Sequence, residues 1–314
     1  MNQAALQSVF NLSLLTATLG SATPLVFVAL GALISERSGV MNIGTEGMML
    51  IGAFTGMAVA VITHSAWAGV AGAIIGGALG GFVLAVWAVT LATDQIVVGI
   101  VINLISSGIT TFLYQVFFPQ TGGDLLRTPP FGTWSVPLLA NLPGVGQIVV
   151  ANPLVYVAFV LVVVVSVFLF RTPPGLVLRA VGESARSADV AGINILQVRY
   201  AATIVGGALA GLGGSYLSLV AAHAFQPNMT AGRGFIALAA VIFGRWRPGG
   251  ALIACLLFGA ADAFQFRVQG LGLGIPPLSF TLLPYLVTLA ALIGIVGKVI
   301  APAEDGKPYI KEEV

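Results

Sequence analysis

Charged residues are scarce in this chain of 314 amino acids. Aspartate, glutamate, lysine and arginine make up 8% of it, whereas soluble domains carry about 25%. The 13 basic and 11 acidic residues leave a net charge of +2. So few charges cannot cover the surface of a soluble globule of this size, and they form no basic patch. The composition therefore excludes a cytosolic enzyme, a disordered protein and a nucleic-acid-binding protein.

Cysteine is almost absent as well, and so is positive charge near the amino terminus. Cys255 is the only cysteine, so no disulfide can form within the chain. No lysine or arginine precedes Arg37, which argues against the basic start of a cleaved signal peptide. We expect an uncharged tail there instead.

Long apolar segments dominate what is present, since 58% of the residues are hydrophobic. About 20 helical residues cross a bilayer core of roughly 30 Å. A further apolar segment, 233–244, is short, and we expect a short or broken helix there. The predicted fold is an all-α polytopic membrane protein of about nine transmembrane helices, forming a single transmembrane domain over 1–314. The eight longer segments are 12–34, 46–62, 66–92, 94–118, 150–170, 200–221, 249–267 and 281–297.

Glycine is abundant, with 40 residues, and part of it is spaced for helix packing. Pairs of glycines four residues apart let membrane helices approach closely. We therefore expect helix-packing faces, with no chemistry implied, at Gly76, Gly77, Gly80, Gly81, Gly207 and Gly211.

Basic residues predict the orientation. The stretch 171–199 carries four arginines, which marks it as a cytoplasmic loop by the positive-inside rule. Counting spans from this loop places the amino terminus outside and the carboxy terminus inside. We expect the polar tail 301–314 to be frayed.

The segments 12–118 and 200–297 have similar layouts. In each, a long helix is followed by a glycine-containing turn and then by a short helix, which begins at Glu46 or at Arg233. The two segments start on opposite sides of the membrane, as in the inverted repeats of transporters. Coincidence is the alternative, because the two halves share little sequence identity.

Polar residues recur along the fourth span. Asn103, Ser107, Thr110 and Tyr114 are spaced so that they share one helix face. Together with Asn42, they are our candidates for lining the path of a neutral polar solute. The alternative is that these side chains only form hydrogen bonds between helices.

Three other features are open to structural interpretations. Thr45 is expected to cap the next helix, and Glu46 in its first turn suits the helix dipole. Asp262 is an intramembrane acid, which an ion-coupled carrier would need. The structural alternative is that Asp262 reaches water or forms a pair near its helix end.

The stretch 175–193 predicts a short helix on the cytoplasmic side. Ser184 is expected to be its N-cap, and Gly192 is expected to follow its end. An exposed helix of this kind suits the docking of a cytoplasmic partner, and a solvated loop is the alternative. No phosphate-binding GxxxxGK[ST] motif, metal-ligand cluster or catalytic grouping occurs in the sequence, so we do not expect an enzyme.

Four stretches, in this order, resemble the permease subunits of ATP-binding-cassette importers. The family contains branched-chain amino-acid and simple-sugar permeases, and the resemblance favours its nucleoside or simple-sugar branch. The matching stretches are Glu36–Ala53, Asp94–Thr111, Gly175–Ile193 and Gly232–Trp246.

The resemblance implies an importer for neutral polar solutes, most consistent with nucleosides of the guanosine type. It implies three partners in a bacterial cell membrane: a cytoplasmic ATP-binding subunit, a second, paralogous permease and an extracytoplasmic substrate-binding lipoprotein. ATP would bind to the separate subunit, so this chain itself needs no cofactor. The residues carried over as the coupling surface for the ATPase are Arg179, Gly182, Glu183, Arg186, Asp189 and Gly192.

Other interpretations of the sequence remain open. A simple-sugar permease would share the same motifs. An ion-coupled secondary carrier would depend on Asp262 and need no ATPase. A channel would not accumulate its solute.

Overall fold

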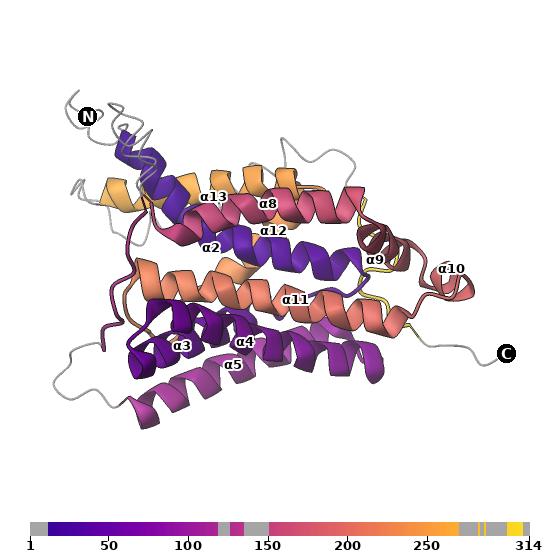
Figure 1. The fold of residues 1–314 in the computed structure, drawn as a ribbon, viewed down its shortest axis with the longest axis horizontal. Coiled ribbons are helices and arrows are strands. Elements are labelled where there is room, and N and C mark those ends of the chain that lie inside the picture. Colours follow the sequence, from indigo (N-terminus) through magenta and orange to yellow (C-terminus); the bar gives the residue numbers. More distant parts are fainter. Residues whose placement is uncertain are drawn as a thin grey trace.

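The computed structural model describes residues 12–118, 126–134, 151–269 and 300–309, together with residues 282 and 286. These residues form α-helices, two of which continue into short π-helices (Figure 1). The elements are α2 (Leu12–Arg37), α3 (Thr45–Thr63), α4 (Ala66–Ala85), η1 (Val86–Thr90), α5 (Gln95–Phe117), α8 (Pro153–Arg171), α9 (Pro173–Glu183), α10 (Ala185–Val190), α11 (Ile195–Ser215), η2 (Tyr216–Ala221), α12 (Arg233–Phe243) and α13 (Pro248–Gln269).

Within the described residues, seven helices are long and apolar enough to cross a membrane. They correspond to seven of the eight long segments predicted from the sequence, which confirms the all-helical polytopic fold. The eighth predicted segment, 281–297, lies outside the described residues. The segment predicted to be short is indeed a helix of only 11 residues, α12.

The long helices lie side by side, with α2 and α11 at the centre (Figure 1). α11 packs against α2, α3 and α4, and α13 packs against the other side of α2. α12 contacts α2, α3 and α13, so one face of this short helix is buried against them. α9 and α10 lie beyond one end of the long helices.

Glycines allow the central helices to touch, as their spacing predicted. A Cβ added to Gly77 would lie 2.2 Å from the carbonyl oxygen of Gly207, and one at Gly211 would lie 2.1 Å from that of Ala73. Gly76 and Gly80 face α3 instead, where Thr55 and Met48 leave no room for a larger residue. The predicted packing faces are confirmed, and α4 uses one set toward α11 and the other toward α3.

Candidate functional site

The amino-terminal end of α12 lies against the side chain of Glu46. Both carboxylate oxygens accept backbone N–H groups: Oε1 from Gly232 at 2.8 Å and Oε2 from Gly234 at 2.6 Å. Glu46 is only 8% exposed, and α12 has no side-chain cap of its own. This distant carboxylate therefore satisfies N–H groups at the start of α12 and complements the positive end of its dipole.

The carboxy-terminal end of α12 is held by the last turn of α2. The indole N–H of Trp246 donates a hydrogen bond of 2.6 Å to the buried carboxylate of Glu36. The guanidinium of Arg37 donates two more, of 3.0 and 2.8 Å, to the carbonyl oxygen of Trp246. Segment 36–46 therefore holds α12 at both ends.

The backbone is strained on both sides of α12. Ala231 precedes this helix with a φ of 47°, and Arg245 and Trp246 follow it with φ of 54° and 52°. A residue other than glycine in this left-handed region costs roughly 1–2 kcal/mol. The contacts with Glu46, Glu36 and Arg37 offset that cost, so α12 would tend to shift if they broke.

The start of α3 differs from the predicted one. Gly44 occupies the N-cap position and makes no side-chain cap. Thr45 is buried in the helix, and its hydroxyl has no hydrogen-bond partner. The prediction that Thr45 caps α3 is wrong, because the segment is held from α5 instead.

Two amides of α5 support this segment. Oε1 of Gln95 accepts the N–H of Met41 at 2.7 Å. Asn103 accepts the N–H of Gly47 at 2.7 Å and donates to the carbonyl oxygen of Ile43 at 3.0 Å. Asn103 therefore satisfies backbone groups at the point where the chain enters α3.

The other members of the predicted polar stripe also face protein atoms. Thr110 is buried and donates to the carbonyl oxygen of Ser106 at 2.7 Å. Tyr114 is buried, and its ring centroid lies 5.1 Å from that of Phe225. Ser107, in the middle of α5, is half-buried. Their role in a solute path stays a prediction.

Asn42 lies fully buried beside the start of α3. Its Nδ2 lies 3.7 Å from the sulfur of Met48, and its Oδ1 has no hydrogen-bond partner. In this arrangement Asn42 lines no open space, and its assignment to the solute path stays a prediction.

Asp262 is paired with a residue of the short helix. Its Oδ2 lies 3.8 Å from Nη2 of Arg233, the first residue of α12. Arg267 instead donates to the hydroxyl of Ser13. Asp262 is thus one more contact of α12, as the structural interpretation of this acid expected. Within the described residues, no three His, Cys, Asp or Glu side chains are grouped to hold a metal ion.

The end of the molecule that carries α9 and α10 has the predicted caps. The hydroxyl of Ser184 accepts the N–H of Ser187 at 3.3 Å. Gly192 has a φ of 80°, and its N–H donates to the carbonyl oxygen of Asp189 at 2.9 Å. The N–H of Ile193 reaches back to Ala188 at 3.0 Å. These are the two bonds of a Schellman motif, which ends α10 sharply.

Arg179, Gly182 and Asp189, among the predicted coupling residues, contact other parts of this chain. Arg179 lies over the ring of Phe170, with its guanidinium carbon 5.1 Å from the ring centroid. Gly182 is buried so closely that a Cβ there would lie 2.1 Å from the carbonyl oxygen of Arg37. Asp189 accepts the hydroxyl of Tyr309 at 2.9 Å.

The other three coupling residues, Glu183, Arg186 and Gly192, are exposed. Beside them lies Val190, which is 87% exposed and which the sequence analysis did not single out. A large apolar side chain at the tip of a short polar helix is the signal that could have identified it.

The segment 300–309 packs against the rest of the chain, so the prediction of a frayed tail is wrong for residues 301–309. The N–H of Glu304 donates to the carbonyl oxygen of Gly182 at 2.9 Å. The buried guanidinium of Arg199 donates to the carbonyl oxygen of Lys307 at 3.0 Å. Burial raises the pKa of Asp305 to about 7, although the nearby charge of Arg199 opposes this rise. Residues 310–314 lie outside the described residues.

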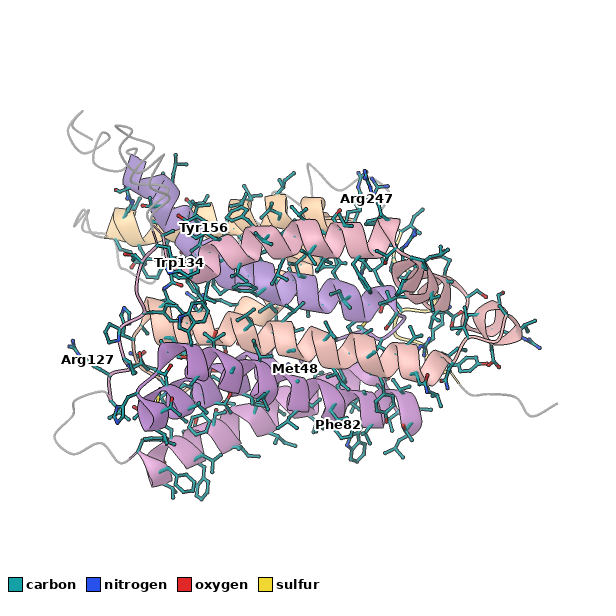
Figure 2. The ribbon with its side chains drawn as sticks, in the orientation of Figure 1. Met48, Phe82, Arg127, Trp134, Tyr156 and Arg247 are labelled. Carbon is teal, nitrogen blue, oxygen red and sulfur yellow. The ribbon has the colours of Figure 1, made fainter. Side chains whose placement is uncertain are left out.

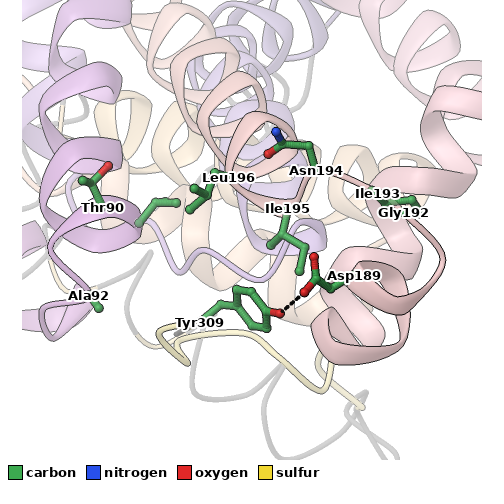
Figure 3. A pocket seen from close by; sticks show the side chains of 10 residues that line it. Thr90, Ala92, Asp189, Gly192, Ile193, Asn194, Ile195, Leu196 and Tyr309 are labelled. Carbon is green, nitrogen blue, oxygen red and sulfur yellow. Dashed lines mark hydrogen bonds between the residues drawn. The ribbon is translucent and has the colours of Figure 1, made fainter. Parts of the chain in front are cut away.

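Tyr309 borders a pocket of about 710 Å³ between α10 and the start of α11 (Figure 3). Its hydroxyl points to Asp189, and Thr90 and Leu196 lie on the opposite side. The carboxy-terminal segment is thereby attached to α10 as well as to α9 and α11.

A continuous set of contacts joins α9 with α12. Gly182 at the end of α9 touches the carbonyl oxygen of Arg37. The Arg37 side chain binds Trp246, which follows α12 and also binds Glu36. The carboxy-terminal ends of α2 and α12 meet here. A movement of α9 can therefore reach both of them through direct contacts.

Comparison with known proteins identifies the family. Residues 14–295 match the family described as branched-chain amino acid transport system / permease component. The guanosine ABC transporter permease protein NupQ of Bacillus subtilis (strain 168) is 38% identical over 307 residues, which cover 94% of this chain and 95% of NupQ.

Two other relatives are similar over most of their length. The nucleoside ABC transporter permease protein NupC of Lactococcus lactis subsp. cremoris (strain MG1363) is 37% identical, covering 93% of this chain and 94% of NupC. The Haloferax volcanii protein named "Putative glucose ABC transporter permease protein TsgC13" is 40% identical, covering 85% of this chain and 81% of TsgC13. The chain therefore belongs to the branched-chain amino acid transport system permease family: it is the non-enzymatic, multi-pass membrane permease subunit of an ATP-binding-cassette transporter, in which a separate subunit handles ATP.

Proposed function

We propose that this permease belongs to an importer of nucleosides, with guanosine-type purines as its solutes. The observation that carries this proposal is the whole-length similarity to a guanosine and a nucleoside permease. The fourth span adds support, because Asn103, Ser107 and Thr110 are polar but uncharged, and Tyr114 lies in an aromatic cluster with Phe225. Hydrogen bonds and stacking, rather than charge, suit a nucleoside. A simple sugar is the second candidate, favoured by the similarity to TsgC13.

Uptake of labelled guanosine by cells with and without this gene tests the substrate. We expect uptake to depend on the gene and on ATP, and we expect unlabelled adenosine, but not leucine, ribose or glucose, to compete. A sugar that competes best would move the assignment to simple sugars and leave the importer architecture intact. Uptake that persists without ATP would contradict the importer itself.

We propose that α9 and α10 are the coupling surface for the ATP-binding subunit. Arg179, Gly182 and Asp189 would keep the shape of this surface through their partners within the chain. Glu183, Arg186 and Gly192 would face the ATPase, with Val190 as an apolar anchor. This assignment places the end with α9 and α10 in the cytoplasm, the carboxy terminus inside and the amino terminus outside.

The double substitution Arg186→Glu and Val190→Asp is expected to release the ATPase. Loss of an apolar anchor and reversal of a charge at an interface together cost about 2–4 kcal/mol or more, which weakens association by roughly 30-fold or more. The measurement is the amount of ATPase that co-purifies with the permease. Arg127→Glu, at the opposite end of the molecule (Figure 2), is the matched control. ATP-driven uptake at the wild-type rate by the double variant would refute the coupling surface.

We propose that a second, paralogous permease covers the outer face of α5. Its side chains there are large and apolar, such as Leu104 and Phe112, but Ser107 is only half-buried and Gly108 has no neighbouring atom within contact distance. Small residues let a helix of another subunit approach closely, so a second subunit suits this face. An extracytoplasmic lipoprotein would deliver the solute to the path between the two.

We propose that 12–118 and 200–297 are inverted halves of the single permease domain. α4 packs against α11 of the other half, and α13 packs against α2 in the corresponding way. The starts of the two shorter helices also meet, since Glu46 in the first turn of α3 binds the start of α12. In transporters built from such repeats, the amino-terminal ends of short helices often meet in the interior of the protein.

A further inference from the structure

We propose that the groove between α8 and α13 binds an anionic phospholipid, with the phosphate between two arginines and an acyl chain along α8. The groove has a volume of about 810 Å³, within the roughly 300–1,000 Å³ typical of ligand sites. It is lined on α8 by Val163, Val167 and Arg171 and at the start of α13 by Arg247, Gly249 and Gly250. This inference does not depend on which solute the importer carries.

Positive charge gathers at one end of the groove. Arg171 ends α8, and Arg247 immediately precedes α13. Both side chains are exposed, and Arg247 points outward from the body of the molecule (Figure 2). Arg37 and Arg179 lie nearby, with guanidinium carbons 5.9 and 5.1 Å from the centroid of the Phe170 ring.

No acidic residue is among the described residues that line this groove. Nearby like charges repel one another, so an anion between Arg171 and Arg247 lowers the electrostatic energy. The start of α13 adds backbone N–H groups, and Gly249 keeps them accessible, because a Cβ there would meet no atom within contact distance. A phosphate with a single negative charge fits this set of donors.

Apart from Ser166, the α8 wall of the groove beyond Arg171 is apolar, and it belongs to a membrane-spanning helix. Val163 is 62% exposed and Val167 45% exposed on α8. A soluble ATPase cannot extend an acidic segment along the lipid-facing side of a transmembrane helix. An acyl chain can, because it already occupies that layer. The combination of a basic end and an apolar wall therefore favours a phospholipid over a protein segment or a free anion.

The test measures lipid binding by the complete transporter, with its ATPase, in detergent by native mass spectrometry. The probes are short-chain phosphatidylglycerol, phosphatidylcholine of the same chain length, and inorganic phosphate. We expect phosphatidylglycerol to bind and phosphatidylcholine not to bind. Excess phosphate should not displace the lipid. Equal binding of both lipids would overturn the charge assignment, and displacement by phosphate would reduce the groove to a general anion site.

The double variant Arg171→Gln and Arg247→Gln should bind phosphatidylglycerol about 30-fold more weakly, since each arginine near an anionic lipid contributes roughly a factor of five. Arg245→Gln is the matched control, because Arg245 is exposed next to the groove but does not line it. Gly249→Phe would fill the groove without touching either charge and should also abolish binding. Unchanged lipid binding by both groove variants would refute the site. Loss of the ATPase in the double variant, with lipid binding retained, would assign the arginines to the protein partner instead.

Discussion

Replacing Glu46 by alanine is expected to abolish solute uptake. Alanine would leave the N–H groups of the half-buried Gly232 and the buried Gly234 without their acceptors, at about 1–3 kcal/mol each. The total is about 2–6 kcal/mol. It lowers the population of the state in which α12 keeps its observed position by more than about tenfold. The positive end of this helix would also lose its neutralising charge. The measurements are uptake of labelled solute and the amount of assembled permease in the membrane.

Two further substitutions separate this contact from general disturbance of the region. Glu46→Gln keeps one acceptor but turns an amide donor toward the other N–H, so we expect partial loss of uptake. Thr45→Val replaces the neighbouring buried hydroxyl, which has no partner, and should leave uptake near the wild-type rate. Normal uptake by Glu46→Ala would mean that packing alone holds α12 in its position, without the hydrogen bonds to Glu46.

The long helices could be predicted because their signal is local. In a span of about 20 apolar residues, nearly every residue indicates a transmembrane segment, and the lipid environment forces the backbone into a helix. Close packing by α4 and α11 could also be predicted, since Gly77 and Gly211 each belong to a pair of glycines four residues apart. The caps at Ser184 and Gly192 were predicted for the same reason, because both caps depend on neighbours within a few residues.

The contacts that hold α12 could not be predicted, because their partners are distant in sequence. Glu46 binds a helix start 186 residues away, and in the sequence it looked like an ordinary first-turn acid of its own helix. The signal for this contact lies in the sequence at the start of α12. α12 begins at Gly232-Arg233-Gly234 without a serine, threonine, aspartate or asparagine cap, so a buried start there requires an acceptor from elsewhere.

The carboxy-terminal segment shows the opposite error. Its polar composition suggested a frayed tail, since nothing in residues 301–309 can form a core of its own. The segment is ordered by partners in other parts of the chain, above all Gly182 and the buried Arg199. An arginine at the start of a membrane helix, predicted only to mark the cytoplasmic side, therefore also binds this segment.

Replacing Trp246 by phenylalanine is expected to uncouple ATP hydrolysis from transport. The indole N–H that binds Glu36 is lost, which leaves a buried side-chain oxygen without its donor, at a cost of about 1–3 kcal/mol. That is enough to shift an equilibrium between two positions of α12 by about 5- to 150-fold. The strained backbone at Arg245 and Trp246 favours the shift. The surface of α9 and α10 is untouched, so the ATPase should still bind and hydrolyse ATP.

The informative measurement is the amount of solute imported per ATP hydrolysed, because a variant that merely folds poorly would lose both activities together. Glu36→Gln is the matched control, since its amide oxygen can still accept the indole N–H. In a Glu36→Ala background, which removes the acceptor, Trp246→Phe should cost less than in the wild type, and the difference measures the bond itself. An unchanged ratio of import to hydrolysis in Trp246→Phe would show that α12 does not receive the movement of α9 through this contact, and the path from Gly182 through Arg37 would have to end elsewhere.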